Sequence, residues 1–122
     1  MENWKHLKVL VVDDLKIKLF MISKLLKTTQ IQITHAENGK IAVKLCSNEK
    51  FDIILMNILM PVMDGFEATK EIRRFNKDVI IIAQTNYANL LEKCLEGGFN
   101  DYIRNPFSKE ALIEIIKKHI KS

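Results

Sequence analysis

The chain has few of the residues that mark secreted or membrane-spanning proteins. Its two cysteines, Cys46 and Cys94, have no C-x-x-C spacing and no nearby histidine cluster, so reduced thiols in a cytoplasmic protein are favoured over a disulfide. No apolar run approaches the ~18 residues that are needed to cross a bilayer. The first eight residues are polar and contain no apolar core of a signal peptide. We therefore expect a cytoplasmic protein without direct membrane contact.

Neither charge sign dominates, and aromatic residues are scarce. The 122 residues include 19 basic and 15 acidic side chains, a formal net charge of +4, and 7% aromatics. There is no stripe of arginines with interleaved aromatics, so direct nucleic-acid binding is not expected. The small basic excess is compatible with an acidic partner surface. The length and the 48% hydrophobic fraction indicate one domain over residues 1–122, with a core at about 7–121.

What the sequence does contain is a regular alternation of apolar runs and helical stripes. Runs typical of strands are Leu7–Val12, Ile31–Ala36, Phe51–Met56, Val79–Ala83 and Asp101–Ile103. Helical spacing follows each run, over Lys16–Thr28, Gly39–Ser47, Phe66–Phe75, Ala88–Glu96 and a last stretch from an N-cap at Ser108 to about Lys121. This order predicts an α/β fold, with a five-stranded parallel sheet and five helices on both of its faces.

Polar residues stand where the predicted strands end. These residues are Asp13-Asp14, Asn57, Thr85 and Asn105-Pro106. Because parallel strands end at the same edge of a sheet, the side chains should converge there. Two adjacent carboxylates repel unless a cation compensates them, and Mg²⁺ binds carboxylate and carbonyl oxygens. Alternatively, one aspartate caps the helix that follows. Both roles remain open at this point.

Four segments carry these residues: "VLVVDD" at 9–14, "DIILMNILMPVMDG" at 52–65, "IIAQTNYA" at 81–88 and "DYIRNPF" at 101–107. In this order the sequence resembles the receiver domain of response regulators, over nearly its whole length. The resemblance implies a flavodoxin-like fold with strand order 2-1-3-4-5. It also implies a regulatory domain of two-component phosphorelay signalling rather than an enzyme. In that family a histidine kinase supplies a phosphoryl group to an aspartate.

The resemblance assigns a role to five residues of this chain. Asp13 and Asp14 match the acidic pair that holds Mg²⁺, and the backbone carbonyl of Leu59 matches a further metal ligand. Thr85 matches the hydroxyl that follows the phosphoryl group. Tyr102 matches the aromatic switch position in the fifth strand. The resemblance thus implies Mg²⁺ as a cofactor.

Two positions depart from the family. The phosphoacceptor aspartate is replaced by Asn57. The family also has a lysine followed by a proline that is often preceded by a cis peptide bond. Here the proline is Pro106, and the lysine is replaced by Asn105. An amide oxygen is a poor nucleophile, so Asn57 should not accept a phosphoryl group by the family route. Asn105 also removes an ammonium. Asp13 and Asp14 alone give this site a charge of −2. An intact family site, with three carboxylates and one lysine, has the same net charge. This match favours a naturally degenerate site with weakened Mg²⁺ binding, in which Asn57 is a weak ligand.

Lys16 and Lys18 follow the acidic pair closely. We expect both ammonium groups to point into water. The alternative is that one of them reaches back over Asp13 and Asp14 and replaces the missing cation.

Three functional hypotheses follow. The favoured one is a receiver that is not phosphorylated and acts as an interaction module. It would bind a histidine kinase or phosphotransfer protein through its first helix, and an output partner through its fourth helix, fifth strand and fifth helix. The second is an active phosphoacceptor domain, whose Asn57 is an engineered change or which uses Asp13 or Asp14. The third and weakest is a flavin or nucleotide binder, because Asp13-Asp14 would repel a phosphate. Similarity of "ENWKHLKVLVVDD" to receivers fused behind kinases favours a domain excised from a hybrid histidine kinase.

Overall fold

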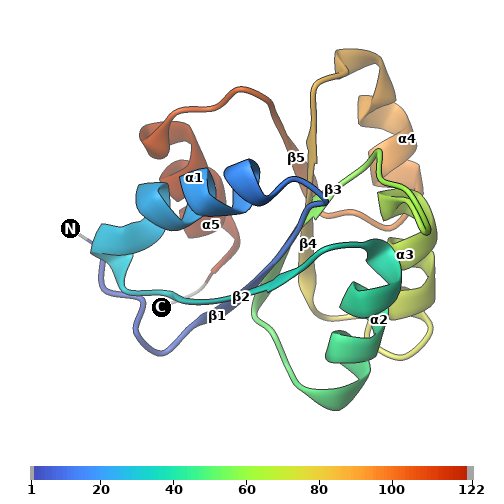
Figure 1. Ribbon diagram of the computed structural model, residues 1–122, viewed down its shortest axis with the longest axis horizontal. Coiled ribbons are helices and arrows are strands. Elements are labelled where there is room, and N and C mark those ends of the chain that lie inside the picture. The colour runs from blue at the N-terminus through green and yellow to red at the C-terminus, as the bar shows by residue number, and fades with distance from the viewer. Residues whose placement is uncertain (1, 121–122) are drawn as a thin grey trace.

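Five strands form one parallel sheet in the order β2-β1-β3-β4-β5 (Figure 1). The computed structural model describes residues 2–120. The strands are β1 (Lys8–Val12), β2 (Gln32–Ala36), β3 (Ile53–Asn57), β4 (Ile80–Thr85) and β5 (Asp101–Arg104). The α-helices are α1 (Lys16–Leu26), α2 (Gly39–Asn48), α3 (Gly65–Arg73), α4 (Leu91–Glu96) and α5 (Lys109–His119), with short 3₁₀ turns at Lys27–Thr29 and Ala88–Leu90. The predicted fold class and strand order are confirmed.

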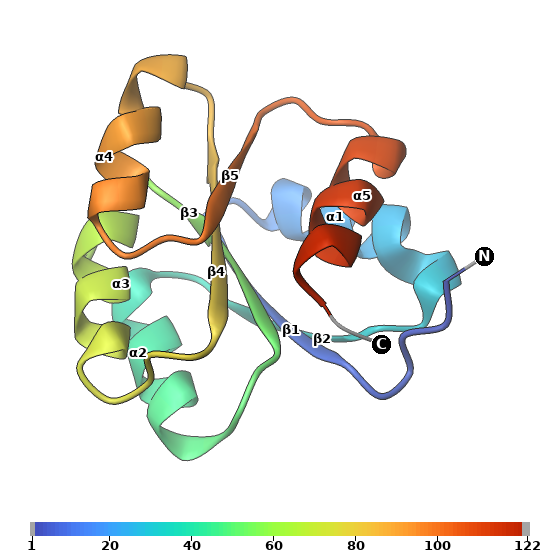
Figure 2. The same cartoon turned by 180° about the vertical axis from the view of Figure 1, so that it is seen from behind.

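The helices cover both faces of the sheet. Helices α1 and α5 lie on one face, and α2, α3 and α4 lie on the other (Figures 1 and 2). Strand β1 shows how the sequence serves both faces, because Leu10 and Val12 belong to the core beside α2–α4, whereas Val9 and Val11 belong to the core beside α1 and α5. A strand that is buried on both faces needs an uninterrupted apolar run, as the sequence predicted.

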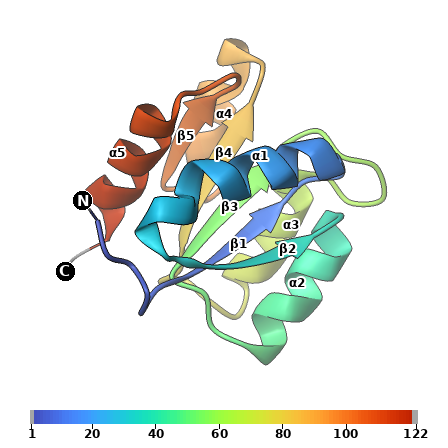
Figure 3. The same ribbon diagram turned by 60° about the vertical axis from the view of Figure 1, so that its left-hand side comes forward.

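Side-chain caps fix where several helices begin. Asn38 accepts a hydrogen bond from the backbone of Ile41 at the start of α2. Asp64 and Glu67 form a reciprocal capping box at the start of α3. Ser108 accepts from the backbone of Ala111 at the start of α5, so the predicted N-cap is confirmed. These caps anchor the loops that leave the carboxyl ends of β2, β3 and β5, which lie at the same edge of the sheet (Figure 3).

Several boundaries differ from the prediction. Strand β4 extends to Thr85 rather than Ala83, because Gln84 and Thr85 are in register with Asn57 and Arg104. The predicted helix over 88–96 begins as a 3₁₀ turn, and its α-helical part has six residues. Helix α3 ends at Arg73 rather than Phe75, because the chain turns where the side chain of Asn76 accepts hydrogen bonds from the backbone of residues 78 and 79.

Two further observations concern the ends of the chain and the lengths of the helices. The last helix ends at His119, and the predicted end at Lys121 lies outside the described residues. Among residues 2–120, no helix has the length and apolar character needed to cross a membrane.

Candidate functional site

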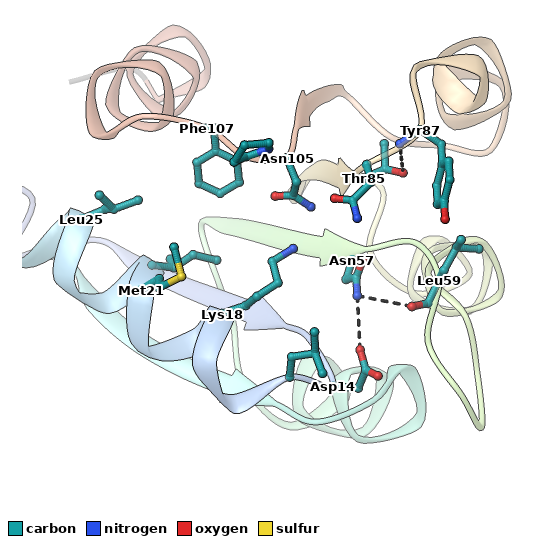
Figure 4. Close-up of a pocket in the computed structure, with 14 residues that line it drawn as sticks. Asp14, Lys18, Met21, Leu25, Asn57, Leu59, Thr85, Tyr87, Asn105 and Phe107 are labelled. Atoms are coloured by element: carbon teal, nitrogen blue, oxygen red, sulfur yellow. Dashed lines mark hydrogen bonds between the residues drawn. The ribbon is translucent and has the colours of Figure 1, made fainter.

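A cavity of about 460 Å³ opens at the carboxyl ends of the central strands (Figure 4). Its polar end is lined by Asp14, Asn57, Thr85 and Asn105, and its apolar end by Met21, Leu25 and Phe107. The predicted convergence of strand ends is therefore observed. The polar half comes from the last residues of β3 and β4 and from the loops that follow β1 and β5, and the apolar half comes from α1 and the loop before α5.

Asp13 is the buried member of the acidic pair. Its side chain has no solvent exposure, and its Oδ1 accepts a hydrogen bond of 3.0 Å from the backbone N–H of Leu15. Its Oδ2 is also buried and has no hydrogen-bond partner among the described residues. Burial raises the pKa of the Asp13 carboxyl above its usual range, and the Leu15 N–H and the nearby Lys18 ammonium oppose that rise.

Neither aspartate caps α1 in the expected way. The N-cap residue of this helix is Leu15, and no side chain caps it. Asp13 accepts the N–H of Leu15 itself, one residue before the helix begins. Asp14 is exposed and lines the cavity. Both carboxylates are therefore directed to the site rather than used to start the helix.

The amide of Asn57 sits among the oxygens that the resemblance assigns to a metal. Its Nδ2 lies 3.4 Å from Asp13 Oδ1, 3.4 Å from Asp14 Oδ1 and 3.4 Å from the carbonyl oxygen of Leu59. Figure 4 shows the bonds to Asp14 and Leu59. These hydrogen bonds are long, because N–H···O bonds in proteins are mostly ~2.9–3.0 Å. One nitrogen donor thus occupies the centre of a group of three oxygens.

Lys18 supplies a positive charge at the same place. Its Nζ lies 3.4 Å from Asp13 Oδ2, and its side chain is 22% exposed. It points from α1 into the cavity (Figure 4), whereas Lys16 is exposed. The expectation that both lysines point into water is wrong for Lys18. With Asp13 and Asp14 the pocket therefore carries a formal charge of −1 rather than −2.

The remaining predicted positions are only partly brought together. Thr85 is 3% exposed, and its Oγ1 accepts a hydrogen bond of 3.1 Å from the backbone N–H of Tyr87. Asn105 lines the cavity and precedes a cis peptide bond to Pro106, as the resemblance implied. In the described part of the chain, no hydrogen bond joins the side chains of Asn57 and Asn105.

Tyr102 lies away from the cavity. It is half-buried and packs against the core beside α2, α3 and α4. Sequence reasoning also passed over Gln84, a fully buried residue whose side-chain amide has no hydrogen-bond partner among residues 2–120. The available signal was a polar residue that stands between the apolar run 79–83 and Thr85.

The oxygens present fit a hard divalent cation. Two carboxylates and one carbonyl converge from β1 and the loop after β3, which is a donor set suited to Mg²⁺. The Oδ2 of Asp13, which accepts no hydrogen bond among the described residues and lies 3.4 Å from the Lys18 ammonium, adds a further negative oxygen nearby. No group of three or more His, Cys, Asp or Glu side chains is found within the part of the chain described, so a third carboxylate is missing.

Comparison with known proteins bears on the family. Residues 9–117 match the family described as response regulator receiver domain. The chain is 36% identical over 129 residues to hybrid signal transduction histidine kinase B of Dictyostelium discoideum, covering 93% of this chain but 7% of that protein. The chain spans between 7% and 13% of the first curated relatives that it matches.

Two solved structures share the fold closely. The receiver domain of sensor histidine kinase PA1611 from Pseudomonas aeruginosa, which has a magnesium ion in its active-site cleft, is 33% identical, with a TM-score of 0.87 over 95% of this chain and 98% of that one. The receiver domain of Ssk1 from Saccharomyces cerevisiae, crystallised with the phosphotransfer protein Ypd1, is 30% identical, with a TM-score of 0.88 over 98% and 90%. Such domains are regulatory modules of two-component signalling. With the strand order, the convergent acidic pair and the family match in agreement, this chain belongs to the response regulator receiver domain family.

Proposed function

We propose that this receiver domain is not phosphorylated at position 57 and signals by binding partner proteins. The observation that carries the proposal is the position of the Asn57 amide, whose nitrogen lies among Asp13, Asp14 and Leu59. An amide is a poor nucleophile, and this one directs its N–H donors at the acidic pair. Asn105 also offers no ammonium to a phosphoryl group.

Divalent metal binding is part of this proposal, in a weakened form. Asp13, Asp14 and the carbonyl of Leu59 would hold Mg²⁺, and Asn57 would have to rotate to present its amide oxygen. The metal would neutralise the charge of the two carboxylates. Asn57 supplies a neutral oxygen in place of an anionic one, so the affinity should be lower than with three carboxylates.

The surface of α1 supports a protein-binding role. Four large apolar side chains on and beside this helix are between 51% and 62% exposed, namely Leu15, Ile17, Phe20 and Met21. Met21 also lines the apolar end of the cavity. A contiguous cluster of exposed apolar residues often marks a site of protein–protein interaction. Because the Ssk1 receiver was crystallised with Ypd1, we assign this face to a histidine phosphotransfer protein or a kinase domain.

Other parts of the proposal follow the family more loosely. An output partner would bind the face of α4, β5 and α5, where Tyr102 is half-buried. Residues 1–122 would act as one domain, within a longer hybrid kinase. The free thiols of Cys46 and Cys94 suit a reducing compartment such as the cytoplasm.

Intact-mass spectrometry tests the central claim. The wild-type protein is incubated with acetyl phosphate and Mg²⁺ beside the variants Asn57→Asp and Asn57→Asp with Asn105→Lys. We expect no added phosphoryl mass on the wild type and an added mass on the double variant, which restores both the nucleophile and the ammonium. The single variant should react less completely than the double variant.

Each other outcome has a defined meaning. A phosphoryl group mapped to Asp14 in the wild type would support the alternative that another aspartate is the acceptor. Asp13 is a weaker candidate, because it is buried and paired with Lys18. A single Asn57→Asp change that fully restores phosphorylation would contradict the idea of two co-adapted replacements. An unreactive double variant would remove the control, and phosphoramidate would then replace acetyl phosphate as the donor.

A further inference from the structure

Lys18 is placed differently from the other lysines near the site. It lies in the first turn of α1, and its ammonium reaches back to within 3.4 Å of the Oδ2 of Asp13. That oxygen is fully buried and accepts no hydrogen bond within residues 2–120. A buried carboxylate that has neither a hydrogen bond nor a cation is costly, so the ion pair compensates a specific deficit.

The contact is also unlike an ordinary surface ion pair. The side chain of Lys18 is 22% exposed and that of Asp13 is 0% exposed, whereas the pair of Arg74 and Glu71 at the end of α3 is 69% and 38% exposed. Exposed pairs contribute little because water screens them. A half-buried ammonium beside a buried carboxylate is screened much less.

We propose that Lys18 is the resident cation of this acidic site. Together with the amide of Asn57, it occupies the electrostatic role that a divalent metal would otherwise have, from the first helix rather than from the position of Asn105. Figure 4 shows its side chain pointing into the cavity that Asn57 and Asn105 also line. Metal and ammonium then compete for the same carboxylate, so the folded domain holds its acidic pair without metal. This inference does not depend on whether position 57 accepts a phosphoryl group.

Competition predicts that removing the ammonium strengthens metal binding. The test variant is Lys18→Met, which keeps most of the side-chain length and removes the charge. Lys16→Met is the matched control, because it makes the same change of net charge two residues away on an exposed side chain. Mn²⁺ affinity is measured by water-proton relaxation in about 0.15 M salt, where the screening length is ~8 Å. The fluorescence of Trp4 is not a suitable reporter of metal binding. Trp4 lies at the opposite end of β1 from the site, where its backbone N–H donates a hydrogen bond to the carbonyl of Thr29.

We expect Lys18→Met to bind Mn²⁺ about tenfold more tightly than the wild type, which corresponds to roughly 1.4 kcal/mol. Lys16→Met should change the affinity by no more than about twofold, since the screened charge is remote. Lys18→Arg keeps a cation and should keep the low affinity of the wild type. Equal affinities for Lys18→Met and Lys16→Met would overturn the proposal, as would the absence of Mn²⁺ binding by Lys18→Met.

Thermal stability provides a second readout. In EDTA, Lys18→Met should melt at a lower temperature than Lys16→Met, because the carboxylate of Asp13 loses the ammonium that lies 3.4 Å from it. Adding Mg²⁺ should raise the melting temperature of Lys18→Met and leave that of the wild type nearly unchanged. If Lys18→Met does not fold, Lys18→Gln replaces it. A wild type that Mg²⁺ stabilises as strongly as the variant would contradict a resident cation.

Discussion

Replacing Asn57 by aspartate should destabilise the metal-free protein. The new carboxylate oxygens would lie about where the Asn57 amide now is, 3.4 Å from an oxygen of Asp13 and 3.4 Å from an oxygen of Asp14. Two unit charges ~4 Å apart repel by about 4 kcal/mol at an effective dielectric constant of ~20. The exposure of Asp14 and the attraction of Lys18 reduce the sum. We expect a net loss of roughly 2–3 kcal/mol, out of a total stability of about 5–15 kcal/mol.

Magnesium should reverse that loss in the variant only. A ligand that binds the folded state alone stabilises it by about 2.7 kcal/mol when its concentration is ~100 times the dissociation constant. The variant has three anionic oxygens at the site, and the wild type has a neutral amide and a competing ammonium. We therefore expect Mg²⁺ to restore Asn57→Asp close to wild-type stability, while the wild type gains little.

Urea denaturation followed by circular dichroism, in EDTA and in excess Mg²⁺, measures both effects. Asn57→Ala is the matched control, because it removes the amide hydrogen bonds without adding a charge. Asn57→Asp should be less stable than Asn57→Ala in EDTA and more stable in Mg²⁺. The reasoning is refuted if the two variants are equally stable in EDTA, or if Mg²⁺ stabilises the wild type as much as Asn57→Asp.

Three further predictions concern other residues. Gln84→Met should raise the free energy of unfolding by about 1–2 kcal/mol in urea denaturation, because it removes a buried amide that has no hydrogen-bond partner; a loss of stability would show that the amide is bound by water. Burial alone would raise the pKa of the Asp101 carboxyl, but hydrogen bonds from His119 and its other donors hold that pKa below its usual range. This stabilisation is present above pH ~4 and is lost as pH falls further, so Asp101→Asn should flatten the fall of melting temperature between pH ~4 and ~2. Phe20→Ala should weaken binding of the probe Ypd1, measured by amide chemical shifts, by about tenfold or more. Phe75→Ala, which alters another exposed phenylalanine, should leave the binding unchanged. Equal losses of affinity in the two variants would exclude α1 as the docking face.

The fold could be predicted because two independent sequence signals, apolar runs and helix caps, indicate the same order of elements. The apolar runs predicted the strands, and the N-cap at Ser108 predicted the start of the last helix. Boundary predictions failed where a contact made outside the predicted segment decides where the element ends. Strand β4 continues through Gln84 because the backbone of Asn57 pairs with it, and no local propensity indicates that. Helix α3 ends early because Asn76 caps the turn that follows.

The site could be predicted only in its composition. The resemblance selected Asp13, Asp14, Asn57 and Thr85, and parallel strands bring them together. The contact of Lys18 could not be chosen from the sequence, because a lysine at that spacing can turn to water or to the acidic pair. What decides is the burial of Asp13 Oδ2, which is known only once the sheet and α1 are in place. The charge count of −2 was wrong for the same reason.

The position of Lys18 also limits how such a domain can signal. A receiver that is switched by phosphate needs a ligand that binds one conformation better than the other. Moving a two-state equilibrium from 1:99 to 99:1 requires a differential affinity of ~10⁴. Here Lys18 offsets one of the two carboxylate charges from within the chain, and the amide of Asn57 donates hydrogen bonds to both carboxylates. Neither residue is a group that a kinase could add or remove. On our proposal that position 57 accepts no phosphoryl group, the difference between states comes from a partner that contacts the surface, and we expect that partner at the exposed apolar face of α1.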